Sequence, residues 1–285
     1  MRPRRIVVSG GNGYIGKHVT RALVAFGHSV SVADLQFEET PRGVVRLEEP
    51  IFGGDKDIFG KLGSPEVLIH LAWQDGFSHH ATSHIDQLPV HARFLRDMLE
   101  GGLQHVVGMG SMHEVGYHVG VIDENTAESP RSEYGVAKVA LRRLVEIYAE
   151  RTGAVFQWIR AFYVTGDDAR SRSVFAKILA ASRARDARFP FTSGRNEYDF
   201  IAVEELGGQI AAVASQDEVT GIINCCSGIS EPLGGRAERF IAEHGLEIAL
   251  EFGVFPDRPY DSPAVWGDVS KIRAILEAVH TSDDA

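Results

Sequence analysis

Short apolar runs alternate with longer amphipathic segments along the first half of the chain. Runs that are apolar at successive positions are typical of strands buried on both faces. The strand-like runs lie at residues 5–9, 28–33, 67–72, 106–109 and 156–162. Segments with helical spacing lie between them, at residues 15–26, 88–99 and 132–151. Strands separated by helices in this way predict a doubly wound α/β fold, with a parallel sheet covered on both sides.

The second half has a different pattern, with glycine, arginine and aromatic residues clustered between Val164 and Phe200. The predicted helices lie at residues 173–185, 204–214, 235–244 and 270–279, and the predicted strands at 222–225 and 247–252. The buried strand at 222–225 is expected to return to the main sheet. We therefore expect a main domain over residues 1–165 and a smaller, mainly substrate-binding portion over residues 166–285.

Composition limits the partners that this chain can have. Among 285 residues, 29 are basic and 39 acidic, so the formal net charge is −10. An acidic surface repels phosphate backbones and anionic lipids, so we expect neither nucleic acid nor a membrane as a partner. No segment approaches the ~20 apolar residues of a membrane helix, and the apolar stretch after the basic start is too short for a secretory signal.

The two cysteines, Cys225 and Cys226, are neighbours on a predicted strand. Neighbouring residues on a strand point to opposite faces, so we expect no disulfide between them. This cysteine usage is typical of a reducing compartment, and we expect a cytoplasmic protein.

A glycine-rich segment, Gly10-Gly11-Asn12-Gly13-Tyr14-Ile15-Gly16, directly follows the first predicted strand and opens the first helix. In a Rossmann-type fold, Gly10 would permit the tight turn, Gly13 the approach of a pyrophosphate, and Gly16 close packing of helix and sheet. The phosphates would face the free N–H groups of the helix N-terminus. A flexible turn is the alternative, but the position favours a dinucleotide site, which makes residues 1–165 an NAD-binding Rossmann domain.

Asp34 ends the second predicted strand, where an acidic residue of such folds accepts hydrogen bonds from the adenosine ribose. A carboxylate at this position would repel the extra phosphate of NADP, and Leu35 rather than arginine follows it. NAD is therefore favoured over NADP, although Arg42 or Arg46 could fold back and weaken this preference.

Tyr134 and Lys138 lie four residues apart near the start of the helix at 132–151. This spacing puts a phenol and an ammonium on one helix face, and a nearby cation stabilises the tyrosinate that a proton transfer requires. A surface Tyr–Lys pair is the alternative. Ser111 supports the catalytic interpretation, because it follows a strand terminus and residues at the carboxyl ends of parallel strands face the ligand.

The ordered set of motifs resembles the extended short-chain dehydrogenase/reductase family, the group of nucleotide-sugar epimerases, dehydratases and reductases. Besides the glycine segment and the Tyr/Lys pair, the resemblance rests on His70-Leu71-Ala72-Trp73 for the family's HxAA, on Arg160-Ala161-Phe162-Tyr163-Val164-Thr165-Gly166 and on Arg258-Pro259-Tyr260-Asp261. It implies a homodimer and a catalytic trio of Tyr134 as acid/base, Lys138 on the nicotinamide ribose and Ser111 on the reacting oxygen. The residues that it places by the cofactor are Leu71, Ala72, Trp73, Met109, Ala161, Tyr163 and Val164.

Other residues are expected to contact the substrate. The resemblance implies that Arg258 approaches the nucleotide diphosphate, with Arg195 as a weaker candidate. Trp73 is expected to line the sugar pocket, with packing as the alternative. His113 and Glu114 follow Ser111 closely, so we consider a substrate contact beside a structural hydrogen bond. His79, His80 and His84 have no acidic or cysteine partner at ligand spacing, so we expect a polar loop beside the active site rather than a metal site.

Departures from the family pattern narrow the reaction. Similar dehydratases have an Asp-Glu pair directly after the Ser/Thr, whereas Met112 and His113 follow Ser111 here. Fucose-synthase-type enzymes have a cysteine at the position of His113. The chain is most similar to reductases of nucleotide-linked 4-keto-6-deoxyhexoses, and we expect the nucleotide to be dTDP. A 4-epimerase with tightly held NAD and a non-catalytic dinucleotide sensor are the alternatives, and the Tyr/Lys pair argues against the sensor.

Overall fold

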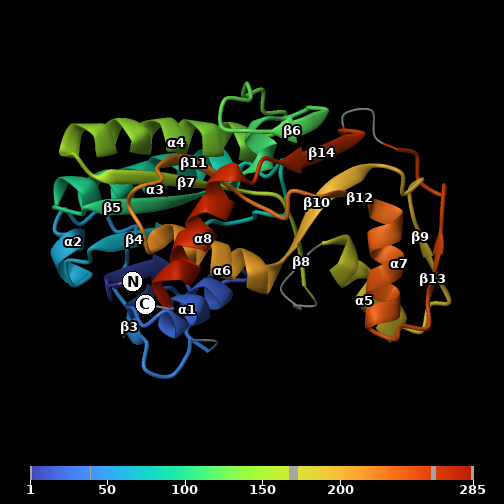
Figure 1. The fold of residues 1–285 in the computed structure, drawn as a ribbon, viewed down its shortest axis with the longest axis horizontal. Helices are drawn as coiled ribbons and strands as arrows, with labels where there is room; N and C mark the ends of the chain where they lie inside the picture. The colour runs from blue at the N-terminus through green and yellow to red at the C-terminus, as the bar shows by residue number, and fades with distance from the viewer. Residues whose placement is uncertain (1, 39, 167–172, 258–260, 284–285) are drawn as a thin grey trace.

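A seven-stranded, all-parallel sheet forms the centre of the computed structural model (Figure 1), which describes residues 2–38, 40–166, 173–257 and 261–283. The strand order is β11-β7-β5-β4-β1-β2-β3, so the chain winds outward from β1 in both directions. This arrangement confirms the predicted Rossmann-type fold. The strands are β1 (Arg5–Ser9), β2 (Ser29–Ala33), β3 (Val45–Leu47), β4 (Val67–His70), β5 (His105–Ser111), β7 (Val155–Ala161) and β11 (Gly221–Cys225).

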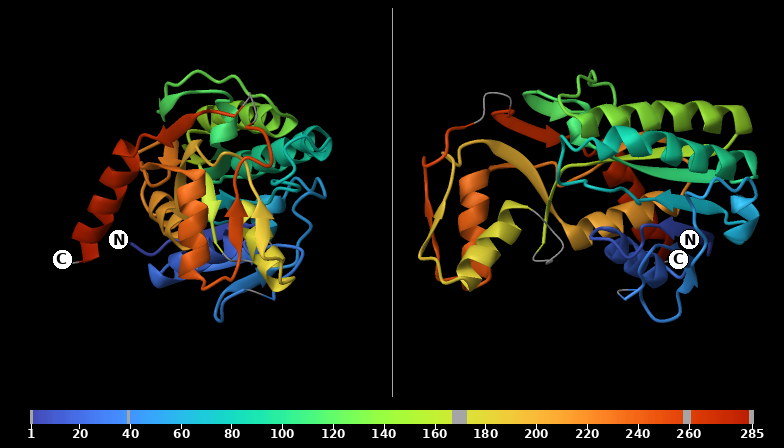
Figure 2. Two further views of the ribbon diagram at one scale, coloured as in Figure 1. Left: turned by 90° about the vertical axis from the view of Figure 1, so that its right-hand side faces the viewer. Right: turned by 180° about the vertical axis from the view of Figure 1, so that it is seen from behind.

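Helices cover both faces of this sheet (Figures 1 and 2). One face is covered by α1 (Gly16–Ala25), α6 (Val203–Ala214) and α8 (Ser270–Asp283), and the other by α2 (Ile58–Lys61), α3 (Ser83–Glu100) and α4 (Glu133–Thr152). Each layer has its own apolar core, because the strands are buried on both faces. None of the helices in the described part of the chain is long and apolar enough to cross a membrane.

The second portion lies at the carboxyl edge of the large sheet. There β5 continues into the short helix η1 (Met112–Glu114) and β7 is followed by β8. Five short strands form its main sheet: β6 (Gly120–Ile122), β8 (Tyr163–Thr165), β10 (Glu197–Ala202), β12 (Ser230–Pro232) and β14 (Ala264–Gly267). The remaining elements are α5 (Val174–Arg183), α7 (Leu233–Glu243) and the strand pair β9 (Arg188–Pro190) and β13 (Ala249–Glu251). This portion has a third apolar core, and Figure 2 shows it at one end of the molecule.

A buried carboxylate ties the segments of this portion together. Asp199, on β10, is fully buried and accepts hydrogen bonds from the backbone N–H groups of Ser227 (2.8 Å), Gly228 (2.9 Å) and Gly267 (3.1 Å). Ser227 Oγ donates a further bond of 2.6 Å. Backbone donors thus replace the water that the buried charge loses.

Several elements differ from the predicted ones. The helix expected at 88–99 begins at Ser83 and has Pro89 in its interior. The polar stretch before residue 49 contains β3, an edge strand whose side chains are mostly exposed, so it has no apolar pattern. The short strand β9 lies within the aromatic-rich stretch and β8 and β10 overlap its ends, where no strand was predicted.

Helices α1 and α6 approach closely at Gly207. A Cβ at this position would lie 2.8 Å from the backbone carbon of His18, whereas a Cβ at Gly208 would meet no atom within 4 Å. The backbones of the two helices are therefore in contact where Gly207 has no side chain.

The two glycines provide a matched test of this contact. We expect Gly207→Ala to destabilise the protein by about 1–3 kcal/mol because the helices must separate. Gly208→Ala should stabilise it by up to about 1 kcal/mol through helix propensity. Urea denaturation measures both free energies of unfolding, and equal effects of the two substitutions would contradict the close approach.

Two neutral histidines are buried at the amino edge of the sheet. His105 accepts a hydrogen bond from the Arg4 guanidinium at Nδ1 (3.2 Å) and donates one from Nε2 to Gln157 (2.7 Å). His28 accepts from the Arg4 N–H (3.1 Å) and donates to Ser215 Oγ (2.8 Å). Burial is the main cause that lowers both pKa values, and that of His105 falls to about 4.

Stability should therefore decrease at mildly acidic pH. In the unfolded chain His105 takes up a proton near pH 6.5, whereas in the folded protein it does so only near pH 4. Between these values the unfolded state holds the extra proton, so the free energy of unfolding should fall by about 1.4 kcal/mol per pH unit from this residue. Denaturation at several pH values should give a slope smaller by about one proton for His105→Asn, and an unchanged slope would contradict the assignment.

Candidate active site

The glycine turn packs directly against the end of β4. Gly10 has a φ of 74° and donates its N–H to the Ala33 carbonyl (2.9 Å). A Cβ at Gly10 would lie 2.6 Å from the Ala72 nitrogen, and a Cβ at Gly16 would overlap the Gly10 carbonyl. The N-cap residue of α1, Ile15, makes no side-chain hydrogen bond to the helix. This bare cradle before a helix N-terminus fits the pyrophosphate of a dinucleotide.

Asp34 is held at the rim of the same turn. Its carboxylate accepts hydrogen bonds from the N–H groups of Asn12 (2.8 Å) and Leu35 (2.7 Å), which fix its position. A carboxylate has about four lone-pair sites, so further positions remain for ribose hydroxyls. The side chain of Leu35 is 98% exposed. Arg46 lies over the Phe37 ring, with 5.9 Å from its guanidinium carbon to the ring centroid.

Tyr134 and Ser111 meet at the carboxyl edge of the sheet. Tyr134 is in the first turn of α4, which is capped by Ser132 and lies close against η1: a Cβ at Gly135 would be 2.5 Å from the His113 carbonyl. The Tyr134 N–H donates to the His79 carbonyl (3.0 Å). A hydrogen bond also connects the Ser111 and Tyr134 side chains. Contacts with two loops thus fix the phenol beside the serine.

Lys138 lies one turn further along α4 and is 3% exposed. Its Nζ donates to the Met109 carbonyl (2.8 Å) and lies 3.8 Å from the centroid of the Trp73 ring and 5.7 Å from that of Tyr134. Burial lowers the pKa of Lys138 to about 7, and the Glu114 charge opposes this shift. The ammonium and neutral amine are therefore both accessible near neutral pH.

The pKa of the Tyr134 phenol is shifted in the opposite direction. Burial, and then the Glu114 carboxylate, raise the pKa of Tyr134, while the hydrogen bond with Ser111 lowers it. Tyr134 is therefore a neutral phenol that can donate a proton to an oxygen beside Ser111. Deprotonation requires a cation nearby, which Lys138 supplies in its charged form.

Stacked and hydrogen-bonded rings surround Trp73. Its indole donates from Nε1 to His84 (3.0 Å), which in turn donates to the Ser78 carbonyl (3.0 Å). Its face stacks on His91 at 4.6 Å, and His91 is hydrogen-bonded to His70 (2.9 Å). His84 was expected in a polar loop beside the site but is buried on α3, and His91 was not predicted as part of the site. Their spacing of seven residues, two turns on one face of α3, is the signal that could have found them.

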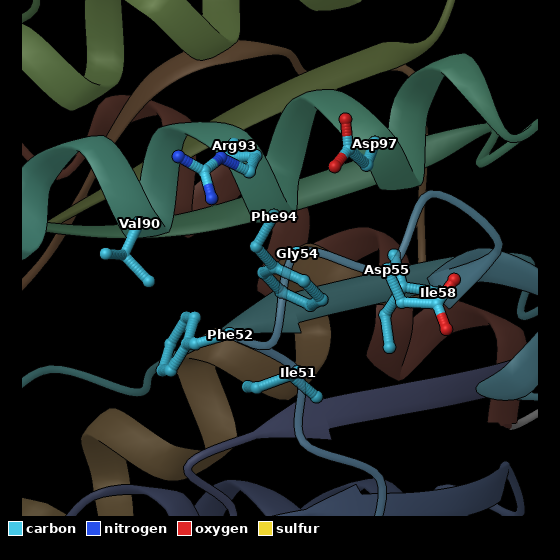
Figure 3. A pocket seen from close by; sticks show the side chains of 9 residues that line it. All are labelled: Ile51, Phe52, Gly54, Asp55, Ile58, Val90, Arg93, Phe94 and Asp97. Atoms are coloured by element: carbon cyan, nitrogen blue, oxygen red, sulfur yellow. The ribbon is translucent and has the colours of Figure 1, made fainter.

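Phe52 supports this layer from the segment before α2, with its ring 4.6 Å from that of His91. Figure 3 shows Phe52 and Phe94 between this segment and α3. The cavity that they line has a volume of about 10 Å³, so it holds at most a water molecule.

Two further histidines lie beside Tyr134. The His79 ring stacks on the phenol at 5.3 Å with an interplanar angle of 13°, and the His113 ring is 4.1 Å from that of His79. Burial lowers the pKa of His113 to about 3, so its imidazole is neutral. No group of three or more His, Cys, Asp or Glu in the described ranges is arranged to hold a metal ion.

Most of the other predicted cofactor residues lie near this edge. Leu71 donates its N–H to the Ser9 carbonyl (3.0 Å), and Ala161 lies opposite Ser111 in the sheet register. Tyr163 and Val164 lie on β8, where the Tyr163 ring is 6.4 Å from that of His113. The Tyr14 hydroxyl would be 3.0 Å from a Cβ at Gly166, so the glycine turn reaches the segment after β8.

Glu114 does not have the environment of a substrate contact. It is fully buried, and its Oε1 accepts hydrogen bonds from the Trp158 indole (2.9 Å) and the Ser111 N–H (3.0 Å). Its Oε2 faces Arg160 (3.9 Å) and Arg142 (4.0 Å). Burial nevertheless raises the pKa of Glu114, because neither arginine is in close contact. This placement corrects the substrate-contact prediction in favour of the structural alternative.

Of the two predicted phosphate contacts, the structure describes Arg195. The Arg195 side chain is 85% exposed and pairs with Asp257 at 4.0 Å. Arg258 lies outside the described residues.

Comparisons with known proteins agree with this geometry. The model of the NAD dependent epimerase/dehydratase family matches residues 6–226. A dTDP-6-deoxy-L-talose 4-dehydrogenase (NAD(+)) from Aggregatibacter actinomycetemcomitans is 42% identical over 271 residues, 92% of this chain and 98% of the relative.

Solved structures share the fold at lower identity. A UDP-N-acetylglucosamine 4-epimerase from Methanobrevibacter ruminantium, in complex with UDP-N-acetylmuramic acid, aligns with a TM-score of 0.82 at 21% identity, over 96% of this chain and 92% of that one. A UDP-glucose 4-epimerase from Thermus thermophilus, in complex with NAD, aligns with a TM-score of 0.74 at 19% identity, over 96% and 93%.

The structural role of Glu114 can be tested by stability. Glu114→Ala should destabilise the protein by about 3–5 kcal/mol, because it removes a buried carboxylate that accepts hydrogen bonds from Trp158 and the Ser111 N–H and faces two buried arginines. Glu146→Ala is the matched control: Glu146 also pairs with Arg142 but is about half exposed, so its loss should cost about 1 kcal/mol or less. Denaturation curves give both values, and a small effect of Glu114→Ala would contradict the structural role.

Proposed function

We propose that this chain, which belongs to the NAD dependent epimerase/dehydratase family, interconverts a nucleotide-linked 4-keto-6-deoxyhexose and its 4-hydroxy sugar by hydride transfer at C4, with dTDP as the nucleotide. The observation that carries this proposal is the 42% identity to a dTDP-6-deoxy-L-talose 4-dehydrogenase over nearly the whole of both chains. The shared length includes the segments that supply both the cofactor edge and the second portion. The chain is an NAD-dependent oxidoreductase.

The cofactor site is proposed at the glycine turn and the adjoining strand ends. Gly10, Gly13 and Gly16 would receive the pyrophosphate, and Asp34 the adenosine ribose. NAD, when bound, accepts or supplies the hydride. The chain's own part is to hold the reacting atoms in place and to move one proton.

The proton is assigned to Tyr134. In reduction, the neutral phenol donates its proton to the C4 carbonyl oxygen, which becomes the sugar hydroxyl. In oxidation, the phenolate takes the proton of the C4 hydroxyl as the C4–H bond is lost. Ser111, which is hydrogen-bonded to Tyr134, would hold the same oxygen. Lys138 in its charged form favours the phenolate and so serves the oxidation direction.

The sugar would lie against the outer side of this site. His113 is the proposed substrate contact, since it is partly exposed and within ring contact of His79 and Tyr163. Arg195 and Arg258 stay proposed contacts of the nucleotide diphosphate. A location in the cytoplasm also remains a prediction.

A homodimer is also proposed, formed through α3 and α4. These two helices pack side by side on one face of the large sheet (Figure 1). They expose apolar side chains, among them Ile85, Val136 and Ile147. Such residues are available for a partner surface.

The reaction can be assayed directly. Purified protein, dTDP-6-deoxy-L-talose and NAD+ should produce NADH, seen by absorbance, and NMR should identify the 4-keto sugar. Formation of the C4 epimer with no net NADH would instead establish a 4-epimerase. Binding of NAD without turnover of any nucleotide-linked 6-deoxyhexose would overturn the proposed activity.

Tyr134→Phe tests the proton assignment. We expect kcat to fall by about 10²- to 10⁴-fold, the usual contribution of a general acid/base, while NAD affinity is largely retained. Tyr148→Phe is the matched control, because it removes a phenol hydroxyl on the same helix fourteen residues further on. Steady-state kinetics and a cofactor-binding titration separate the two effects, and full activity of Tyr134→Phe would exclude this role.

A further inference from the structure

Trp73 occupies a position where the family motif has a small residue, and neither the proton nor the hydride step requires an indole there. Its side chain is anchored by the hydrogen bond to His84 and the stack on His91. The Lys138 ammonium lies over the ring that these contacts hold, at 3.8 Å from the centroid.

We propose that Trp73 is a positioning residue that seats the Lys138 ammonium on its indole face, beside Tyr134, by a cation–π contact. Indole gives the strongest such contact among the aromatic side chains, and a desolvated ammonium gains more from it than an exposed one. The inference rests on the proposed function only in that Lys138 assists Tyr134.

The directions of the contacts support this assignment. An ammonium has three N–H donors. One of those of Lys138 donates to the Met109 carbonyl, and the Trp73 face lies within contact distance of Nζ. Two donors remain, and one of them can meet a ribose hydroxyl. Trp73 thus fixes the direction of the ammonium without using a hydrogen-bond donor.

Other charged and titratable groups face Lys138 from each element around it. Glu114, on η1, stabilises the ammonium. His70 on β4 and His91 on α3 would repel the ammonium if protonated, but burial lowers both of their pKa values. Tyr134 lies on the same helix, with its ring 5.7 Å away. Trp73 is thus an uncharged stabiliser of the ammonium among these groups.

The sign of the Lys138 pKa change separates a cation–π contact from simple burial. If the indole face stabilises the ammonium, then replacing the indole with an aliphatic side chain lowers the pKa. If Trp73 only excludes water, then its removal admits water and raises the pKa. If Trp73 had only a structural role, its replacement would leave the pKa of Lys138 unchanged.

The pKa can be measured by NMR titration of the Lys138 side chain in lysine-labelled protein without cofactor or substrate, with Lys138→Met for assignment. We expect Trp73→Leu to lower the pKa by roughly 0.5–1 unit and Trp73→Phe to lower it less. Trp266→Phe is the control, since Trp266 lies on β14 in the second portion, and it should leave the titration unchanged.

Site-specific incorporation of fluorinated tryptophans at position 73 alone covers the case in which Trp73→Leu does not fold. Fluorine withdraws electron density from the ring face with little change of shape, so the pKa should fall stepwise with the number of fluorines. An unchanged pKa across the series, or a higher pKa in Trp73→Leu, would overturn the proposal. Because no substrate is used, either result is independent of whether the proposed reaction is correct.

Discussion

The rest of the reactive site depends on keeping the buried Lys138 side chain charged. Loss of water lowers its pKa to about 7, so a small loss of support would leave the amine neutral in the working range. The support comes from three separate elements: the Met109 carbonyl on β5, the Trp73 ring after β4 and the Glu114 charge on η1. The carboxyl ends of neighbouring strands must therefore align closely for the ammonium to persist beside Tyr134.

Contacts in the core of the sheet place a similar constraint on the position of Ser111. Side chains at Gly108 and Gly110 would overlap the Trp158 ring, which lies across this part of β5. From there the Trp158 indole donates to Glu114, whose carboxylate also accepts the Ser111 N–H. A buried tryptophan on β7 thus holds the backbone of a proposed catalytic residue. The same contacts serve core packing and the proposed proton transfer, so a substitution of Trp158 in the core would change the position of Ser111.

The features predicted correctly from sequence depend on residues that lie close together along the chain. Buried strands, the glycine turn and the four-residue spacing of Tyr134 and Lys138 are all local patterns. The unpredicted features join distant segments: Trp73 is held by His84 and His91, and the short strands of the second portion pair across long stretches of chain. Glu114 could turn toward the substrate or the core, and its hydrogen bonds with Trp158 and the Ser111 N–H decide this. The domain boundary at residue 165 stays a prediction.

The histidines around Trp73 and Tyr134 divide into two layers, and this division separates buried support from the side proposed to face the substrate. His70 and His84 use both ring nitrogens in hydrogen bonds, so each is committed to holding the interior. His79 and His113 have no ring hydrogen bond among the described residues, and both are partly exposed beside Tyr134. Since 4-epimerases share this backbone at about one-fifth identity, the backbone alone does not decide the reaction. The outer imidazoles, which can still form hydrogen bonds, are where substrate choice can differ within one fold.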